Sequence, residues 1–255
     1  MNDVFALHLG TKPTTSSVGF YFDHAAEPME LAYYCWLIRA SSRTVLVDTG
    51  PRPEVAERRG VELGRPIEEL LADLGVAPGD VDDVVVTHLH WDHVGNLALF
   101  DRAKVWVQRR ELDFWQSSAS AELAFAAAIE RSHLDQLEMV GDRLTVVDDV
   151  AEVIDGIELR HTGGHTHGCQ IVTVQTGDGT VVLASDIAYF AANVETVWPT
   201  LVFHDLAETY AALRLVGDLA SHPSLVVPGH DPATLTNHER ITDDIARITR
   251  LDDTA

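Results

Sequence analysis

Apolar, β-branched and aromatic residues recur along the chain in short runs, each about as long as a single β-strand. Glycine, proline, aspartate and serine separate the runs, as they do where turns join strands. The sequence Thr176-Gly177-Asp178-Gly179 lies between two runs and predicts a hairpin. The pattern predicts strands at Val4–Leu9, Tyr33–Arg39, Thr44–Asp48, Val81–Thr87, Lys104–Gln108, Arg143–Val147, Ile157–His161, Gln170–Gln175, Thr180–Ser185 and Ser224–Pro228.

Four segments instead repeat their apolar positions every three to four residues, which is the period of a helix. They predict helices at Ile67–Leu74, Ala119–Leu137, Leu206–Leu219 and Asn237–Leu251. Strands come first, then mix with helices, and then return, which favours two packed sheets with helices outside them. Because no long linker or repeat interrupts the chain, we expect a single domain over residues 1–255.

The charge of the chain narrows the range of partners. Lysine and arginine number 18 and aspartate and glutamate 40, a net charge of −22. Nucleic acids and anionic membranes select basic surfaces, so neither is expected as a partner. No apolar run approaches the roughly 18 residues of a membrane span, and no secretory signal is visible, which favours the cytoplasm. Two cysteines, Cys35 and Cys169, are too few for a disulfide framework.

Residues that could bind a metal are concentrated directly after the apolar run Val84-Val85-Val86. The segment His88-Leu89-His90-Trp91-Asp92-His93 holds three histidines and one aspartate. Imidazole nitrogens and carboxylate oxygens are zinc ligands, and such a cluster could serve two ions. Further histidine and aspartate side chains follow later strand-like runs or a glycine-rich turn, so we expect them at the same sheet edge; they are His165, Asp186 and His230.

This set of residues resembles the metallo-β-lactamase superfamily. The likeness runs from Val47-Asp48-Thr49-Gly50 to Gly229-His230-Asp231. It implies an α/β fold, a four-layer αββα sandwich with a dinuclear metal centre between its sheets. Carried over residue by residue, it implies one metal held by His88, His90 and His165 and a second held by Asp92, His93 and His230. Asp186 would bridge the two ions, and Asp48 would support the ligands from outside.

Two differences from particular branches of the superfamily narrow the range of expected activities. The diiron, oxygen-reducing members carry glutamate where this chain has His90, which favours zinc and hydrolysis over redox chemistry. The true β-lactamases lack the bridging aspartate that Asp186 would supply and are usually exported, which disfavours antibiotic hydrolysis. Two zinc ions are therefore expected, although iron, manganese and cobalt accept the same ligands.

Tyr189, three residues beyond Asp186, resembles a tyrosine of the N-acyl homoserine lactone lactonases and of related lactonases such as 4-pyridoxolactonase. The resemblance implies opening of a lactone ring by metal-bound hydroxide that attacks the ester carbonyl, and hence quorum quenching. It implies catalytic roles for Tyr189, Asp92 and Asp186, and a homodimer. Taken alone, Tyr189 would also suit a packing residue after a strand.

Other functions remain open at this point. A thioesterase resembling glyoxalase II has the same ligand pattern, but only 25 residues follow His230, too few for the helical domain of that enzyme. Other small-molecule ester or amide hydrolases of the superfamily also fit. A tRNA-processing nuclease is opposed by the charge, and a non-enzymatic metal protein would have little use for a complete ligand set.

The substrate pocket is less defined by the sequence. Small-molecule pockets are mostly apolar, and two groups of apolar residues could line one or simply pack in the core. They are Phe20, Tyr21, Phe22 and Met29 near the N-terminus, and Phe114, Trp115, Trp198 and Phe203 later on. The segment Glu111–Leu137 lies between the first cluster and His165, and whether it covers the site is left open by the sequence.

Overall fold

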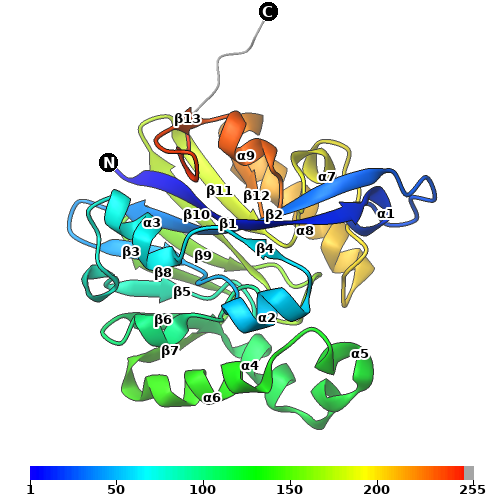
Figure 1. The fold of residues 1–255 in the computed structure, drawn as a ribbon, viewed down its shortest axis with the longest axis horizontal. Helices are drawn as coiled ribbons and strands as arrows, with labels where there is room; N and C mark the ends of the chain where they lie inside the picture. The colour runs from blue at the N-terminus through cyan, green and yellow to red at the C-terminus, as the bar shows by residue number, and fades with distance from the viewer. Residues whose placement is uncertain (250–255) are drawn as a thin grey trace, which may run out of the picture.

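The computed structural model describes residues 1–249 as two β-sheets packed face to face (Figure 1). The larger sheet runs in the order β13 (Glu239–Arg240), β14 (Ile245–Arg247), β1 (Asp3–Thr15), β2 (Pro28–Arg39), β3 (Thr44–Val47), β5 (Asp83–Val85), β6 (Lys104–Gln108) and β7 (Leu144–Val147). A short strand, β4 (Glu62–Leu63), pairs with β1. The smaller sheet has the order β12 (Val226–Pro228), β11 (Gly179–Ser185), β10 (Gln170–Thr176), β9 (Ile157–His161) and β8 (Val150–Ile154).

Helices lie outside both sheets. They are α1 (Ser16–Gly19), α2 (Pro53–Arg58), α3 (Ile67–Asp73), α4 (Arg109–Gln116), α5 (Leu123–Ala126), α6 (Arg131–Val140), α7 (Ala191–Glu195), α8 (Leu206–Leu219) and α9 (Ala233–Thr236). In Figure 1, α4, α5 and α6 gather at the lower end of the molecule, below β7. Over the part of the chain that is described, none of these helices has the length and apolar character of a membrane span.

Alternation along the strands sorts the apolar side chains into separate layers of core. In β2, Tyr33 and Cys35 face helices α2–α4 and α6, while Tyr34 and Trp36 face the smaller sheet. In β11, Val181 and Leu183 meet the larger sheet, while Val182 and Ala184 meet α8. The layers are therefore helix, sheet, sheet and helix, and the predicted αββα sandwich is confirmed.

Parallel pairing brings the ends of several strands to one edge. Strand β3 pairs in parallel with β5, and β5 with β6. In the smaller sheet, β11 and β12 are parallel too. The loops that follow these strands emerge at the carboxyl edge of each sheet, which is where α/β proteins commonly place ligands.

Each predicted strand overlaps an observed strand, and the hairpin at Thr176–Gly179 joins β10 to β11 as expected. Strands β4 and β8 were not predicted. The helices at Ile67–Leu74 and Leu206–Leu219 are confirmed by α3 and α8. The single domain over residues 1–255 stays a prediction.

The prediction of one helix over Ala119–Leu137 is wrong. A 3₁₀ turn at Ser118–Ala121, helix α5 and helix α6 occupy the segment, and the chain between α5 and α6 is not helical. The carbonyl of Ala128 accepts a hydrogen bond from Trp91 N at 3.1 Å, and that of Ala127 accepts one from Arg59 at 2.7 Å. These tertiary hydrogen bonds outweigh the helix propensity of the alanines.

The helix predicted over Asn237–Leu251 is also wrong within the described residues, which end at 249. Strands β13 and β14 form there instead, and β14 pairs with β1 from Leu7↔Ile245 to Phe5↔Arg247. Ile245 and Ile248 are buried in the two cores on opposite sides of the larger sheet. Pairing with an open edge of β1 gives this segment more burial and hydrogen bonding than a surface helix would.

His133 makes the folded state sensitive to acid. Its ring is completely buried on α6, and neither nitrogen has a hydrogen-bond partner. Burial, reinforced by the nearby positive charge of Arg52, lowers the pKa of His133 from 6.5 to about 4. Arg59 acts in the same direction, whereas Glu130 and Glu54 oppose the change without reversing it.

Between pH 6.5 and 4 the unfolded chain therefore binds a proton at this histidine that the folded chain does not. We expect the free energy of unfolding to fall as the pH is lowered through this range, by up to about 3 kcal/mol from this group. His133→Leu should remove this part of the pH dependence in urea unfolding, whereas His24→Gln, at an exposed histidine, should not. Identical slopes for wild type and His133→Leu would contradict the assignment.

Candidate metal centre

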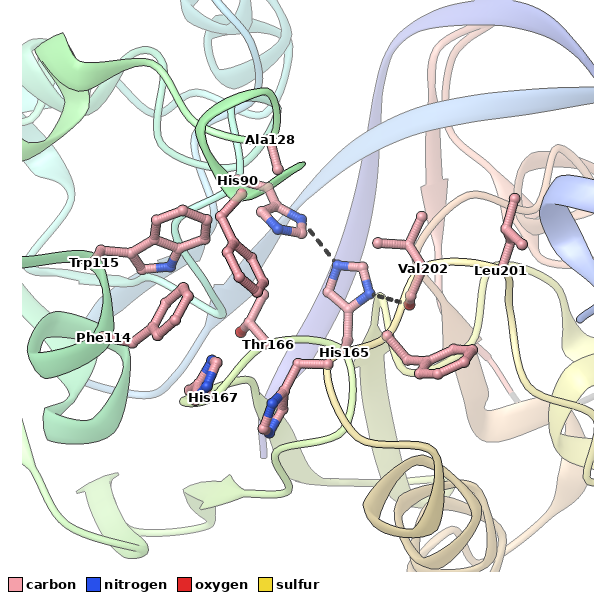
Figure 2. Close-up of a pocket in the computed structure, with 12 residues that line it drawn as sticks. His90, Phe114, Trp115, Ala128, His165, Thr166, His167, Leu201 and Val202 are labelled. Atoms are coloured by element: carbon pink, nitrogen blue, oxygen red, sulfur yellow. Dashed lines mark hydrogen bonds between the residues drawn. The ribbon is translucent and has the colours of Figure 1, made fainter. Parts of the chain in front are cut away.

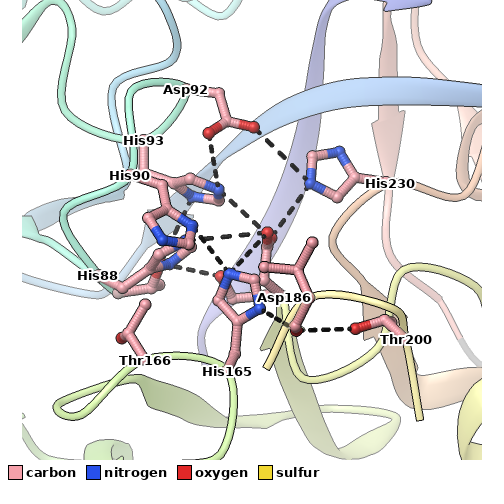
Figure 3. Close-up of polar contacts among 12 residues, drawn as sticks. His88, His90, Asp92, His93, His165, Thr166, Asp186, Thr200 and His230 are labelled. Atoms are coloured by element: carbon pink, nitrogen blue, oxygen red, sulfur yellow. Dashed lines mark hydrogen bonds and ion pairs between the residues drawn. The ribbon is translucent and has the colours of Figure 1, made fainter. Parts of the chain in front are cut away.

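Seven predicted site residues, all of them buried, meet at the carboxyl edge of the two sheets (Figure 3). Four come from the loop that follows β5, and the others come from the loop between β9 and β10 and from the residues after β11 and β12. They are His88, His90, Asp92, His93, His165, Asp186 and His230. The structure therefore brings together every residue that the sequence singled out as a ligand.

The seven residues form two groups. In each group the ligand atoms lie within 4.8 Å of one another; the groups are His88, His90, His165 and Asp186, and Asp92, His93 and His230. The two carboxylate oxygens of Asp186 face different groups. Oδ2 lies 3.3 Å from His165 Nε2, while Oδ1 lies 3.1 Å from His230 Nε2 and 3.3 Å from His93 Nε2. Asp186 thus stands between the two groups, as a bridging carboxylate would.

Hydrogen bonds to the far side of three imidazoles orient them. Nδ1 of His165 donates to the carbonyl of Val202 and Nδ1 of His230 to that of Ala32, both at 2.9 Å. Nδ1 of His93 lies 2.7 Å from Asp48 Oδ2. With Nδ1 engaged in this way, each ring turns Nε2 toward the centre, which is the orientation of metal-ligating histidines.

Several buried polar atoms in the centre have no hydrogen-bond partner. They are Nε2 of His88, Nε2 of His93 and Oδ1 of Asp186. Unpartnered polar atoms are costly inside a protein, and a cation bound at each ligand group would satisfy all three. The set of nitrogen and carboxylate donors therefore fits two divalent ions, and the two groups indicate a dinuclear metal site.

The protonation states suit cation binding as well. Burial lowers the pKa of His88 and of His90 well below the usual range of histidine, so both imidazoles are neutral. Burial by itself would raise the pKa of Asp186, but the neighbouring His230, His93 and His165 hold it well below the usual value. Burial alone would lower the pKa of His93 and of His230, but the charge of Asp186 raises both, so a metal that binds these two imidazoles displaces their protons.

Asp48 supports the centre from behind, as the resemblance implied. Its backbone has φ = 60°, an uncommon conformation for a residue other than glycine, and its side chain is completely buried. Besides His93, it accepts hydrogen bonds from Thr87 N at 2.8 Å and Thr87 Oγ1 at 2.7 Å. The hydroxyl of Ser185, next to Asp186, lies 2.8 Å from Thr87 Oγ1 and extends the network.

A completely buried carboxylate on α4, Glu111, is not among the residues that the sequence singles out. One oxygen accepts hydrogen bonds from Leu89 N at 2.8 Å and Trp115 Nε1 at 2.7 Å. The other accepts them from Thr166 Oγ1 at 2.7 Å and Gly168 N at 2.8 Å. Glu111 thus ties the loop of His88 and His90 to the loop of His165. It lies in no local motif, so the sequence alone offered no signal for it.

Two cavities adjoin the centre and share His90, Ala128 and Val202. One, of about 320 Å³, lies over the second group of ligands, with Asp92, Asp186, Tyr189 and His230 among its lining residues. The other, of about 290 Å³, is aromatic and imidazole-rich (Figure 2); its lining residues include Phe114, Trp115, Phe125, His167, Phe203 and His204. We call these the catalytic cavity and the aromatic cavity.

Some of the predicted pocket aromatics lie elsewhere. Phe20 stacks on Phe190 and packs against Trp198, so these rings serve the core or surface beside the site. Neither cavity includes Tyr21, Phe22 or Met29, although Tyr21 packs against Phe203 at 4.9 Å. The segment Glu111–Leu137 does cover the site, because Phe114, Phe125 and Ala128 line the aromatic cavity.

The model of the metallo-β-lactamase superfamily matches residues 29–230, which is most of the chain. The chain belongs to this superfamily. A curated relative, an N-acyl homoserine lactonase from a Bacillus species, is 26% identical over 220 residues, covering 80% of this chain and 83% of the relative. With the two His/Asp groups, the family membership identifies the protein as a metal-dependent hydrolase.

Solved structures support the fold. A quorum-quenching N-acyl homoserine lactone lactonase superposes with a TM-score of 0.78 at 20% identity, covering 94% of this chain and 96% of that one. An N-acyl homoserine lactone hydrolase with the product N-hexanoyl-L-homoserine bound at its catalytic metal centre gives a TM-score of 0.76 at 19% identity, covering 94% and 97%. At identities this low, the similarity to these structures shows a shared fold and nothing more.

Proposed function

We propose that this protein opens a lactone ring, that of an N-acyl homoserine lactone or a similar lactone, with two zinc ions at the paired ligand groups. One observation carries the proposal: Tyr189 lines the catalytic cavity directly over the ligand groups. Its ring centroid lies 4.8 Å from that of His230 and 6.2 Å from that of His165. Family membership and the lactonase relative lend further support.

The hydroxyl of Tyr189 is available to a substrate. No residue in the described part of the chain hydrogen-bonds to it. Burial raises the pKa of Tyr189 well above the usual range, and the negative charges of Asp186 and Asp92 add to the effect. The phenol therefore keeps its proton over the whole neutral range and can donate it in a hydrogen bond.

The reaction adds water to the ester carbonyl carbon, breaks the ring C–O bond and delivers a proton to the departing alkoxide, which yields a hydroxy acid. Bound ions would supply an activated water and polarise the ester carbonyl. Asp186 holds the two ligand groups at a set separation. Tyr189 donates a hydrogen bond to the substrate oxygen that gains negative charge, and Asp92 or Asp186 passes the proton to the leaving oxygen.

The aromatic cavity suits the apolar remainder of the substrate. It opens beside His90 and His165, so an acyl chain could enter it while the lactone lies over Asp186. The ring of His167 is stacked 3.7 Å from Phe114 on one side and 3.8 Å from His204 on the other. This stack forms one wall of the cavity, and we propose that it limits the acyl length.

The test of this function is proton release by zinc-loaded protein on homoserine lactones of increasing acyl length, with a thioester in the same assay. We expect rapid ring opening that stops after chelation and returns with zinc. The preferred chain length should report the size of the aromatic cavity. Thioester turnover without lactone turnover would replace the proposal with a thioesterase. Full activity of the chelated, metal-free protein would contradict a metal-dependent mechanism.

Tyr189→Phe tests the role of the tyrosine. We expect it to lower kcat for lactones by about 10-fold to 100-fold, the contribution of one hydrogen bond to a charged group, with an unchanged metal content. The control is Tyr210→Phe on α8, at a tyrosine outside both cavities. A wild-type rate for Tyr189→Phe would remove the residue from the mechanism. The homodimer and the cytoplasmic location stay predictions from the sequence.

A further inference from the structure

Arg59 brings a positive charge to the wall of the catalytic cavity. It follows α2 as the residue at its C-terminal cap, and it is the only lysine or arginine among the residues that line this cavity. Its guanidinium lies 4.7 Å from the ring centroid of Trp91, which is flanked by His90 and Asp92. The sequence offered no signal for Arg59, because it lies far along the chain from the ligand motifs.

One end of this guanidinium is fixed by the protein. Its Nη2 donates to the carbonyl of Ala127 at 2.7 Å and lies 3.5 Å from Glu130 Oε1. The cation–π contact with Trp91 restrains the group further. Nε and Nη1 have no partner among the described residues, so N–H donors remain for a ligand in the cavity.

The positive charge of Arg59 is only partly neutralised by neighbouring carboxylates. Arg58 lies 3.1 Å from the same oxygen of Glu130, so two arginines share one carboxylate. The acidic residues of the cavity, Asp92 and Asp186, belong to the proposed metal groups. In a chain with a net charge of −22, a partly exposed arginine at this place is suited to bind an acceptor oxygen of the substrate.

We propose that Arg59 is a specificity residue that binds a second oxygen of the substrate, separate from the scissile ester. This inference rests on the proposed lactonase function and deepens it. The substrate class is a lactone that carries a carbonyl or carboxylate group next to the ring. This group would lie at Arg59 in the catalytic cavity while the ester contacts the metal groups. A planar guanidinium can donate two parallel hydrogen bonds to such a group.

The experiment compares three lactones of matched chain length with the zinc-loaded protein: an N-acyl homoserine lactone, an alkyl lactone without the amide, and a lactone with a free carboxylate. Arg59→Met keeps an apolar stem over Trp91 and removes the donors. For the substrates that Arg59 recognises, we expect KM to rise about 10-fold to 100-fold. For the alkyl lactone, kcat/KM should stay within about twofold of wild type. Whichever of the amide and carboxylate lactones responds identifies the oxygen that is bound.

Arg58→Met is the matched control, because it removes a neighbouring partner of Glu130 that does not line the cavity. It should leave the preference among the lactones unchanged. Arg59→Lys should retain part of the preference. Calorimetric binding of the hydroxy acid products provides a readout without turnover, and metal analysis shows whether the centre is intact.

Equal losses on all three lactones would overturn the inference, since they would mean that Arg59 only holds the segment Ala127–Glu130. Unchanged kinetics on all three would overturn it as well. If the wild type opens none of the lactones, the proposed function fails and the inference falls with it. That outcome is distinct, because it appears before any variant is made.

Discussion

Asp186→Asn is expected to lower hydrolysis by more than about a thousandfold, the scale of losing a group that organises charge stabilisation. The physical reason is the division of its two oxygens between the ligand groups. An asparagine offers one oxygen and presents N–H donors to the other group, where His93 and His230 already direct their nitrogens. Elemental analysis should give fewer than two metal ions per chain.

The control for this variant is Asp218→Asn, at an exposed aspartate on α8. It should keep both ions and the wild-type rate, which separates the bridge from a general effect of charge. Two tightly bound ions together with near-normal turnover in Asp186→Asn would contradict the bridging role. A loss of turnover with both ions retained would keep the role in catalysis but move it from metal binding to proton transfer.

Glu111→Ala is expected to destabilise the fold by about 3–5 kcal/mol, because it leaves buried donors without an acceptor. The donors are Leu89 N, Gly168 N, Thr166 Oγ1 and Trp115 Nε1. Since Leu89 lies between His88 and His90, and Gly168 close to His165, metal affinity should fall as well. Urea unfolding of the metal-free protein measures the first effect, and zinc titration the second.

Asp113→Ala, on the exposed face of the same helix, is the control and should change stability little. Glu111→Gln is a milder test. Its side-chain oxygen would still accept hydrogen bonds from one pair of donors, while its NH₂ group would face the donors of the other pair. We expect it to fold and to bind zinc more weakly. A loss below about 1 kcal/mol in Glu111→Ala would mean that the loops are held by other contacts.

The strands and the ligand residues were predictable because the signal for each lies in a short stretch of neighbouring residues. Alternation identifies a strand from its own residues, and parallel strands such as β3 and β5 end at one edge of the sheet. A histidine or aspartate directly after such a strand therefore reaches that edge. The same edge brings His88 and Asp186 together although they lie 98 positions apart in the chain: His88 Nε2 is 3.8 Å from Asp186 Oδ2.

The helices predicted at Ala119–Leu137 and Asn237–Leu251 failed for the opposite reason. Their residues favour a helix locally, but partners distant in the chain decide their structure. The carbonyl of Ala128 bonds to Trp91, and Ile245 pairs with Leu7 on the edge of β1. No window of sequence around either segment contains those partners.

The sequence by itself thus indicated two packed sheets and the residues that meet at their edge, through apolar alternation and residue type at strand ends, and the resemblance of those residues to a known superfamily implied the αββα sandwich. Only the tertiary structure decided what surrounds them. Glu111 joins two ligand loops, Arg59 faces the catalytic cavity, and the stack on His167 bounds the aromatic cavity. These roles depend on hydrogen bonds and packing between distant segments, whose energies exist only once the chain has folded.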